Sequence, residues 1–320
     1  MRTYLVAFLL AVGIGAVTTP IALHASRRLK LYDLPDGLRK VHSSLTPRTG
    51  GIAIAAGVLA PIVALLFYGN EFAAELKADA PRITAFLTGA LAILGLGLYD
   101  DIKGCGAWAK LGVQTAVAVL LWQAGLRFES LALFGESYSF GLASLPLTIL
   151  WVTAIVNAMN LIDGLDGLAA GVAFFAAVAL FINAQMDGNA MLCLFAAALA
   201  GSVLGFLFYN FSPALIFMGD SGSMTIGYIF AAAGLWGFGK RSTVLALSLP
   251  ILALGLPIAD TALAFVRRAA QGHSPFHSDR GHIHHRLLDA GLTQRQAVLV
   301  LYLVCVVLTG AVVVIRIWAW

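Results

Sequence analysis

The chain has 320 residues, of which 60% are hydrophobic and only 11% are charged, and its mean hydropathy is +0.89. A soluble domain carries about 25% charged residues, so this sequence has too little charge to cover a water-facing surface. The net charge of +4 is too small to indicate a nucleic-acid partner. Cys105, Cys193 and Cys305 show no CxxC spacing, which argues against a disulfide framework or a zinc–cysteine site.

Ten apolar segments, each about as long as a bilayer is thick, follow one another along the chain. We predict membrane spans at residues 3–23, 50–69, 82–99, 109–125, 143–158, 168–186, 190–209, 222–238, 243–266 and 296–318. The first span could pass for a signal peptide, but its apolar stretch is long for one and nine more spans follow. We therefore expect a single all-α polytopic membrane domain over residues 1–320, with about ten transmembrane helices.

Basic residues predict the orientation of these spans. Thirteen of the 20 Lys and Arg residues lie in or beside the loops after the first, third, fifth, seventh and ninth spans. By the positive-inside rule this side faces the cytoplasm, which leaves both termini outside. All seven histidines and nine aspartates fall on the same side. One face of the membrane is therefore equipped for chemistry.

Asp100 and Asp101 stand together at the end of the third span, in the sequence Gly-Leu-Tyr-Asp-Asp-Ile-Lys. Adjacent carboxylates at a membrane boundary are costly to desolvate unless positive charge compensates them. A hard divalent cation such as Mg²⁺ takes oxygen ligands and is a common solution. The alternative is a solvated loop start with Lys103 nearby.

Four polar residues follow the fifth span: Asn157, Asn160, Asp163 and Asp166, in the sequence Asn-Ala-Met-Asn-Leu-Ile-Asp-Gly-Leu-Asp-Gly-Leu. The glycines permit a close backbone approach to a ligand. A calcium loop is excluded because its ladder of oxygen ligands and its closing Glu are missing. A structural turn would explain the glycines but not four polar side chains between two spans.

A third motif, Phe217-Met-Gly-Asp220-Ser-Gly-Ser, lies where the eighth span begins. A helix N-terminus offers free N–H groups that suit phosphate, and Asp220 could hold the accompanying metal. Asp is also a preferred N-cap residue, so a purely structural role is equally open.

The last two motifs are rich in basic residues. His282, His284 and His285 follow Arg280, and we favour phosphate binding over zinc because no cysteine or second histidine pair accompanies them. Lys40, His42 and Arg48 lie in the first of these loops, before Gly50-Gly51. Such residues often only set topology or bind anionic lipid, but the Pro-Arg-x-Gly-Gly turn is more particular than that.

These residues together resemble the polyprenyl-phosphate N-acetylhexosamine-1-phosphate transferases, membrane enzymes of glycosyltransferase family 4 type that start bacterial cell-envelope glycans. The resemblance covers nearly the whole chain, and the motifs occur in the family's order: K-x-H with P-R-x-G-G, Y-D-D, N-x-x-N-L-I-D-G-L-D-G-L, F-x-G-D-S-G-S and D-R-x-H-I-H-H. The H-I-H-H form is similar to the branch that uses UDP-N-acetylglucosamine (UDP-GlcNAc) and undecaprenyl phosphate.

The resemblance implies that a UDP-N-acetylamino sugar donates its sugar 1-phosphate to undecaprenyl phosphate and that UMP leaves. It implies Mg²⁺, or Mn²⁺ in its place, as cofactor. It also implies a lipid-accessible cleft that faces the cytoplasm from the bacterial inner membrane, and it is compatible with a homodimer. The particular amino sugar stays open, as does the glycan pathway (lipopolysaccharide O-antigen or another cell-wall polymer).

The family pattern also implies residue roles. The expected catalytic residues are Asp100, Asp101, Asp163, Asp220, His282, His284 and His285. Asp220 would ligate the metal, with Asn160 or Asp163 nearby. The expected substrate-binding residues are Lys40, His42, Arg48, Asn157, Gly164, Leu165, Asp166, Phe217 and Arg280. Among these, Phe217 would stack on uracil, and Lys40 and His42 would contact the lipid phosphate.

Three questions stay open from the sequence. A lipid phosphate is already ionised near neutral pH and can attack directly, with Asp100 positioning it, but a covalent aspartyl intermediate is also conceivable. Asp260 in the ninth span has either a functional role or a structural ion pair with Arg267 and Arg268. The rival class is a cation-coupled transporter, which would distribute its carboxylates through the depth of the bilayer.

Overall fold

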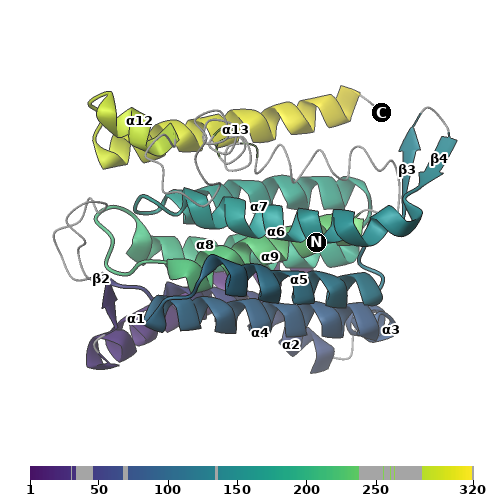
Figure 1. Ribbon diagram of the computed structural model, residues 1–320, viewed down its shortest axis with the longest axis horizontal. Helices are drawn as coiled ribbons and strands as arrows, with labels where there is room; N and C mark the ends of the chain where they lie inside the picture. Colours follow the sequence, from purple (N-terminus) through teal and green to yellow (C-terminus); the bar gives the residue numbers. More distant parts are fainter. Residues whose placement is uncertain are drawn as a thin grey trace.

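The computed structural model describes residues 1–29, 31–33, 46–67, 71–133, 136–237 and 283–318, together with Gly255, Asp260 and Leu263. Its long helices run roughly along one axis (Figure 1). They are α1 (Arg2–Leu29), α2 (Gly50–Phe67), α4 (Ala80–Lys103), α5 (Ala107–Gln123), α6 (Ser144–Ile162), α7 (Leu168–Met186), α8 (Ala190–Asn210), α9 (Gly219–Gly237) and α13 (Gln294–Trp318).

Short elements complete the described part. Two short helices are α3 (Glu71–Ala78) and α12 (Ile283–Asp289). Strand β1 (Tyr32–Asp33) pairs antiparallel with β2 (Thr46–Pro47), and β3 (Ser130–Leu133) pairs antiparallel with β4 (Glu136–Ser139). The sequence did not predict these two ladders, which are too short to show a two-residue hydrophobic period.

Nine of the ten predicted spans coincide with long helices, and the tenth, 243–266, lies outside the described residues apart from three positions. Among the described helices, six are long and apolar enough to cross a membrane: Arg2–Leu29, Ala80–Lys103, Gly141–Ile162, Leu168–Met186, Ala190–Asn210 and Gln294–Ala311. The expectation of an all-α, multi-pass membrane protein is confirmed. Three helices continue at least four residues past their predicted ends: α1 runs to Leu29, α4 continues through Asp100 and Asp101, and α6 continues through Asn160.

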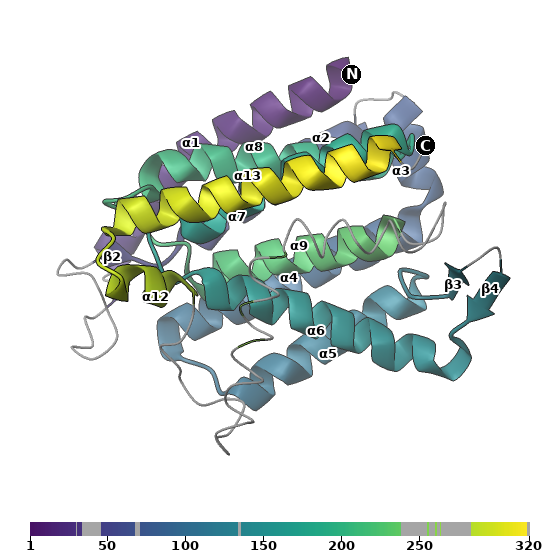
Figure 2. The same ribbon diagram turned by 90° about the horizontal axis from the view of Figure 1, so that it is seen from above.

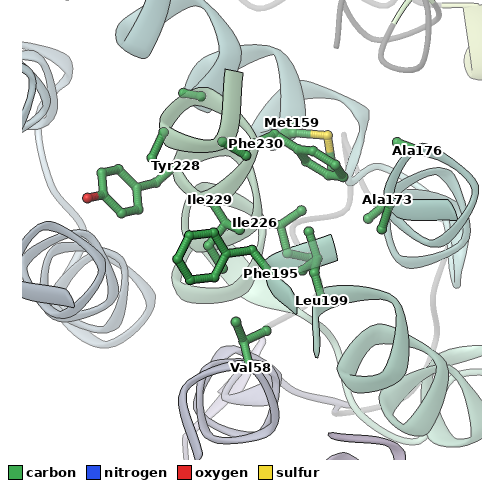
Figure 3. Close-up of a cluster of buried hydrophobic side chains, with 14 of the residues drawn as sticks. Val58, Met159, Ala173, Ala176, Phe195, Leu199, Ile226, Tyr228, Ile229 and Phe230 are labelled. Atoms are coloured by element: carbon green, nitrogen blue, oxygen red, sulfur yellow. The ribbon is translucent and has the colours of Figure 1, made fainter. Parts of the chain in front are cut away.

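Helix α9 is the central helix of the bundle. Every residue from Ser221 to Trp236 is buried, and the helix packs against α2, α4 and α6. In Figure 3 the side chain of Ile226 on α9 lies among Met159 of α6, Phe195 of α8 and Val58 of α2. Protein rather than lipid therefore surrounds α9, which explains why this helix can carry polar and small residues at its start.

The outer helices present apolar side chains outward. Large exposed hydrophobic residues line α1 and α13, among them Leu5, Leu9, Val17, Leu303 and Val307. Exposed apolar surface on this scale is costly in water and is expected where a helix faces lipid.

The helix ends that carry the sequence motifs gather at one end of the bundle. Figures 1 and 2 show β2, α12 and the connections after α4, α6 and α8 at this end. Helix α1 begins, and α13 ends, at the opposite end, near β3 and β4 (Figure 2). We call the end that carries β2, α12 and these connections the motif end.

Candidate active site

The site is built around the first turn of α9, and Asp101 fixes that turn. The Asp101 carboxylate, on the last turn of α4, accepts the backbone N–H of Asp220 at 2.8 Å and that of Ser221 at 3.0 Å. The first N–H groups of a helix have no partner within the helix, so these two bonds satisfy donors that would otherwise be buried. Asp101 therefore acts as a cap supplied from another helix.

The side chain of Asp220 enters a cluster of charged and polar groups. Its Oδ2 accepts from Lys110 Nζ at 2.5 Å and from Asn160 Nδ2 at 3.0 Å. The same Lys110 ammonium lies 2.7 Å from Asp100 Oδ2. Three helices thus converge on one carboxylate: α5 supplies Lys110, α6 supplies Asn160 and α4 supplies Asp100. Asp220 does not cap its own helix, because Asp101 holds that position.

Glycines allow these elements to approach closely. Gly219 has φ +70°, a backbone conformation that other residues rarely adopt, and a Cβ there would overlap Asp101 and the Arg48 carbonyl. A Cβ at Gly51 on α2 or at Gly97 on α4 would overlap the backbone at Ser221 or Gly222. Each glycine therefore brings a neighbouring helix or loop directly against the start of α9.

The Pro-Arg-x-Gly-Gly motif pairs with the Phe217 segment. Phe217 N–H donates to the Pro47 carbonyl at 2.8 Å, and Gly50 N–H donates to the Phe217 carbonyl at 3.0 Å. Gly51 N–H donates to the Met218 carbonyl at 3.1 Å. The first loop is therefore part of the site through its backbone, whatever Arg48 contributes by its side chain.

Asp163 ends α6 beside this cluster. Desolvation by the surrounding protein raises the pKa of Asp163 to about 8, although the residue keeps some exposed surface. The carboxylates of Asp220 and Asp101 raise it further, while the charge of Arg48 opposes the shift. Burial and the neighbouring carboxylates thus both disfavour the ionised form of Asp163.

Hydrogen bonds from three other segments hold the rest of the loop after α6 in place. Asp166 is buried and accepts the backbone N–H of Ala214 at 3.0 Å. Gly167, with φ +77°, donates its N–H to Asn210 Oδ1 at 3.1 Å, and its carbonyl accepts from Tyr302 Oη at 2.6 Å. Asn210 Nδ2 also donates to the Ile216 carbonyl at 2.9 Å. These bonds tie the motif after α6 to the motif before α9.

His284 on α12 packs against the loop after α6. Its ring is buried, and a Cβ added to Gly164 would lie 2.5 Å from His284 Nε2. The His285 ring lies 4.4 Å from it, centroid to centroid. Four other predicted site residues, Lys40, His42, Arg280 and His282, lie outside the described residues.

The structure thus joins Asp101 and Asn160 to Asp220 by direct hydrogen bonds, links Asp100 to Asp220 through Lys110, and places Asp163 beside them. It keeps others apart from that cluster. Asn157 lies one turn earlier on α6 and donates to Gln114 Oε1 at 2.8 Å, while Leu165 belongs to the hydrophobic core.

The sequence interpretation missed two polar residues that organise this site, Lys110 and Asn210. Lys110 entered only the count of basic residues for topology, although a lysine at a membrane boundary opposite Asp100 was a usable signal. Asn210 gave no signal, because a single Asn at a helix end is common. Its two bonds depend on loops that are distant in sequence.

Within the described residues, no group of three or more His, Cys, Asp and Glu side chains forms a ready-made metal cage. A magnesium ion needs fewer protein ligands, since it keeps waters and shares substrate phosphates. The arrangement suits a reaction between charged phosphates: carboxylate and amide groups, an ammonium group and a histidine helix meet at one end of a membrane bundle.

Fold and site together define a multi-pass membrane protein with a cluster of charged and polar side chains at the motif end. The glycosyl transferase family 4 model matches residues 83–238, which include Asp100, Lys110, Asn160 and Asp220.

Three relatives illustrate the similarity over nearly the whole chain. A probable undecaprenyl-phosphate N-acetylglucosaminyl 1-phosphate transferase of Bacillus subtilis (strain 168) is 37% identical over 318 residues, which cover 99% of this chain and 86% of that protein. A decaprenyl-phosphate N-acetylglucosaminephosphotransferase of Mycobacterium tuberculosis (strain ATCC 25618 / H37Rv) is 37% identical, with coverage of 89% and 76%. The undecaprenyl-phosphate alpha-N-acetylglucosaminyl 1-phosphate transferase of Escherichia coli (strain K12) is 27% identical, with coverage of 90% and 77%. The chain belongs to glycosyl transferase family 4, in the branch of polyprenyl-phosphate N-acetylglucosamine-1-phosphate transferases.

Proposed function

We propose that the protein transfers N-acetylhexosamine 1-phosphate, in particular GlcNAc 1-phosphate, from a UDP-sugar to undecaprenyl phosphate and releases UMP. The reaction would take place at the cytoplasmic face of the bacterial inner membrane, in a bundle of about ten transmembrane helices. The activities for which the relatives are named support the acceptor and the transferred group. The UDP donor and the cytoplasmic side rest on the family resemblance and on the distribution of basic residues.

One observation carries the proposal: Lys110 joins Asp100 and Asp220 while Asn160 contacts the same Asp220 oxygen. Phosphoryl transfer needs little covalent chemistry from the protein and depends on positioning and on charge stabilisation. A cluster of this kind at the membrane boundary can meet a lipid phosphate that stays in its bilayer.

Magnesium fits the residues present. Asp220, Asp163 and Asn160 come from α9, from the end of α6 and from α6 itself, and they offer the oxygen ligands that Mg²⁺ prefers. Burial and the neighbouring carboxylates of Asp220 and Asp101 raise the pKa of Asp163, and a bound cation would favour its ionised form. When bound, Mg²⁺ would neutralise charge on the diphosphate oxygens.

We propose a single displacement. An oxygen of the ionised lipid phosphate attacks the sugar-linked phosphorus, the bond from that phosphorus to the bridging oxygen breaks, and UMP leaves with that oxygen. Asp100 already accepts from Lys110 at 2.7 Å, so its carboxylate is engaged as an ion pair. Its role in this scheme is to hold Lys110 toward the reacting phosphates, which does not require a proton transfer.

The remaining predicted residues belong to substrate binding in this proposal. Gly164, Leu165 and Asp166, in the loop that follows Asp163, and Phe217, just before α9, would line the nucleoside site. His284 and His285 would donate to the diphosphate or the sugar. Lys40, His42, Arg48 and Arg280 would meet phosphate groups, which bind guanidinium and ammonium donors well.

The test uses the purified full chain in lipid nanodiscs with undecaprenyl phosphate, Mg²⁺ and a panel of UDP-sugars, and quantifies UMP and lipid product together. We expect equimolar UMP and lipid-linked sugar 1-phosphate with UDP-GlcNAc, only with Mg²⁺ or Mn²⁺, and none with Asp220→Ala. A folded sample that turns over no UDP-amino sugar would refute the transferase proposal and direct attention to ion flux.

A further inference from the structure

Asp260 is hydrogen-bonded to the start of α12, the short helix that carries His284 and His285. Asp260 is nearly buried, and its Oδ1 accepts the backbone N–H of Ile283 at 2.9 Å. Ile283 is the first residue of α12, and residues 281–282 before it are Gly and His, neither of which offers the side-chain oxygen of a typical N-cap. The Asp260 carboxylate, 23 residues earlier in the chain, therefore accepts the N–H of the first helical residue, for which the two preceding residues offer no side-chain oxygen.

The next residue after Ile283 connects this bond to the site. His284 is 2% exposed, and its ring lies so close to Gly164 that a Cβ there would be 2.5 Å from Nε2. Gly164 directly follows Asp163. The hydrogen-bonded Ile283 N–H is therefore one residue away from the ring that packs against the loop carrying Asp163.

A buried carboxylate is costly in a membrane protein, and a charge-assisted hydrogen bond is about twice as strong as a neutral one. We propose that Asp260 is a positioning residue that anchors α12, so that His284 and His285 face the motif end. The link to turnover rests on the transferase function proposed above. The anchor itself does not. In this proposal Asp260 acts on turnover through its hydrogen bond to the Ile283 N–H.

A double-mutant cycle tests this relationship. Asp260→Ala removes the acceptor. Ile283→Pro removes the donor and also restricts the backbone of residue 282, although proline is well tolerated at the first position of a helix. Ile283→Ala keeps the N–H and serves as the matched control, and Asp289→Ala removes an exposed carboxylate at the other end of α12.

Two readouts separate the anchor from the reaction. Hydrogen exchange of amides 283–289 in nanodiscs reports the anchor without any substrate. Steady-state kinetics of the folded fraction then report kcat and KM for the UDP-sugar. We expect faster exchange in 283–289 and a fall in kcat of up to about 100-fold for Asp260→Ala, as for other small misplacements of active-site groups. Ile283→Pro should act alike, and the double variant should be no worse than either single variant. Both controls should match the wild type.

If hydrogen exchange of amides 283–289 is unchanged in Asp260→Ala, the proposal that Asp260 anchors α12 is wrong, even if activity falls. Additive effects in the double variant would show that Asp260 does not act through Ile283. Loosened exchange with unchanged kcat would overturn the link to catalysis. If Asp260→Ala does not fold, Ile283→Pro carries the test, and unchanged exchange of α12 in that variant would overturn the anchor. If the wild type has no transferase activity, the exchange results still decide the anchor.

Discussion

The carboxylate of Asp101 accepts the backbone N–H of Ser221 at 3.0 Å, across 120 residues of sequence. The neighbouring carboxylate, Asp100, points instead to Lys110 at 2.7 Å. Two adjacent aspartates on one helical turn therefore have separate tasks. Asp101 holds the backbone of α9, and Asp100 takes part in the charged cluster.

Asp101→Ala should destabilise the protein and reduce activity together. It leaves two amides at the start of α9 without their acceptor, and losing a cap costs about 0.5–2 kcal/mol. Thermal unfolding in detergent should show a lower Tm, and hydrogen exchange should increase at the first turn of α9. Asp100→Ala is the comparison: we expect loss of turnover with much less effect on exchange at Ser221. Equal effects of the two variants would contradict separate tasks.

Lys110→Met should abolish most of the transferase activity. Removing the ammonium leaves Asp100 and Asp220 close together without their shared cation, and loss of one preorganised charged group costs about 100- to 1,000-fold in kcat. Initial rates of UMP release measure the effect. Lys103→Met is the matched control, since that side chain is exposed and lies over the Tyr99 ring. A Lys103 variant as impaired as the Lys110 variant would argue for a general role of basic charge.

Gly97→Ala should disturb the contact between α4 and α9. A Cβ at this position would overlap backbone atoms of Ser221, which cannot move aside as a flexible side chain could. Overpacking of this kind costs about 1–3 kcal/mol. Gly95→Ala, two residues earlier on the same helix, meets nothing within 4 Å and should be neutral or stabilising by up to about 1 kcal/mol. Tm values of both variants in the same detergent provide the measurement, and equal values would contradict the close approach.

The raised pKa of Asp163 predicts that the stability of the metal-free protein depends on pH. Its pKa is raised from 3.8 to about 8 on folding, so between these values the folded state binds more protons than the unfolded state. Stability therefore falls as pH rises through this window. Asp163→Asn should flatten the Tm against pH curve in chelator and be more stable than the wild type near the upper end. Asp187→Asn, between α7 and α8, should keep the wild-type slope.

The same curve tests the metal proposal. Addition of Mg²⁺ should raise the Tm of the wild type most at the alkaline end, where Asp163 is most readily ionised, and should have little effect on Asp163→Asn. An equal Mg²⁺ effect in both proteins would place the cation elsewhere.

Much of this protein was readable from its sequence. Apolar runs of bilayer length located nine described helices, because a chain in lipid must satisfy its backbone within each segment. The one-sided placement of aspartates and histidines predicted a site at one end, since consecutive spans return alternate loops to the same side. The motifs single out Asp100, Asp101, Asn160 and Asp220 among the polar residues of that end.

Only the tertiary structure decided what each polar group faces. The hydrophobic pattern fixes which residues are apolar, but not which helices become neighbours, so it could not show that Lys110 on α5 lies between Asp100 and Asp220. Nor could it show that Asp101 caps α9, that Asn210 joins two loops, or that Asp260 meets Ile283. Hydrogen bonds of this kind depend on distances of a few tenths of an ångström between segments far apart in sequence, and packing of the whole bundle sets those distances.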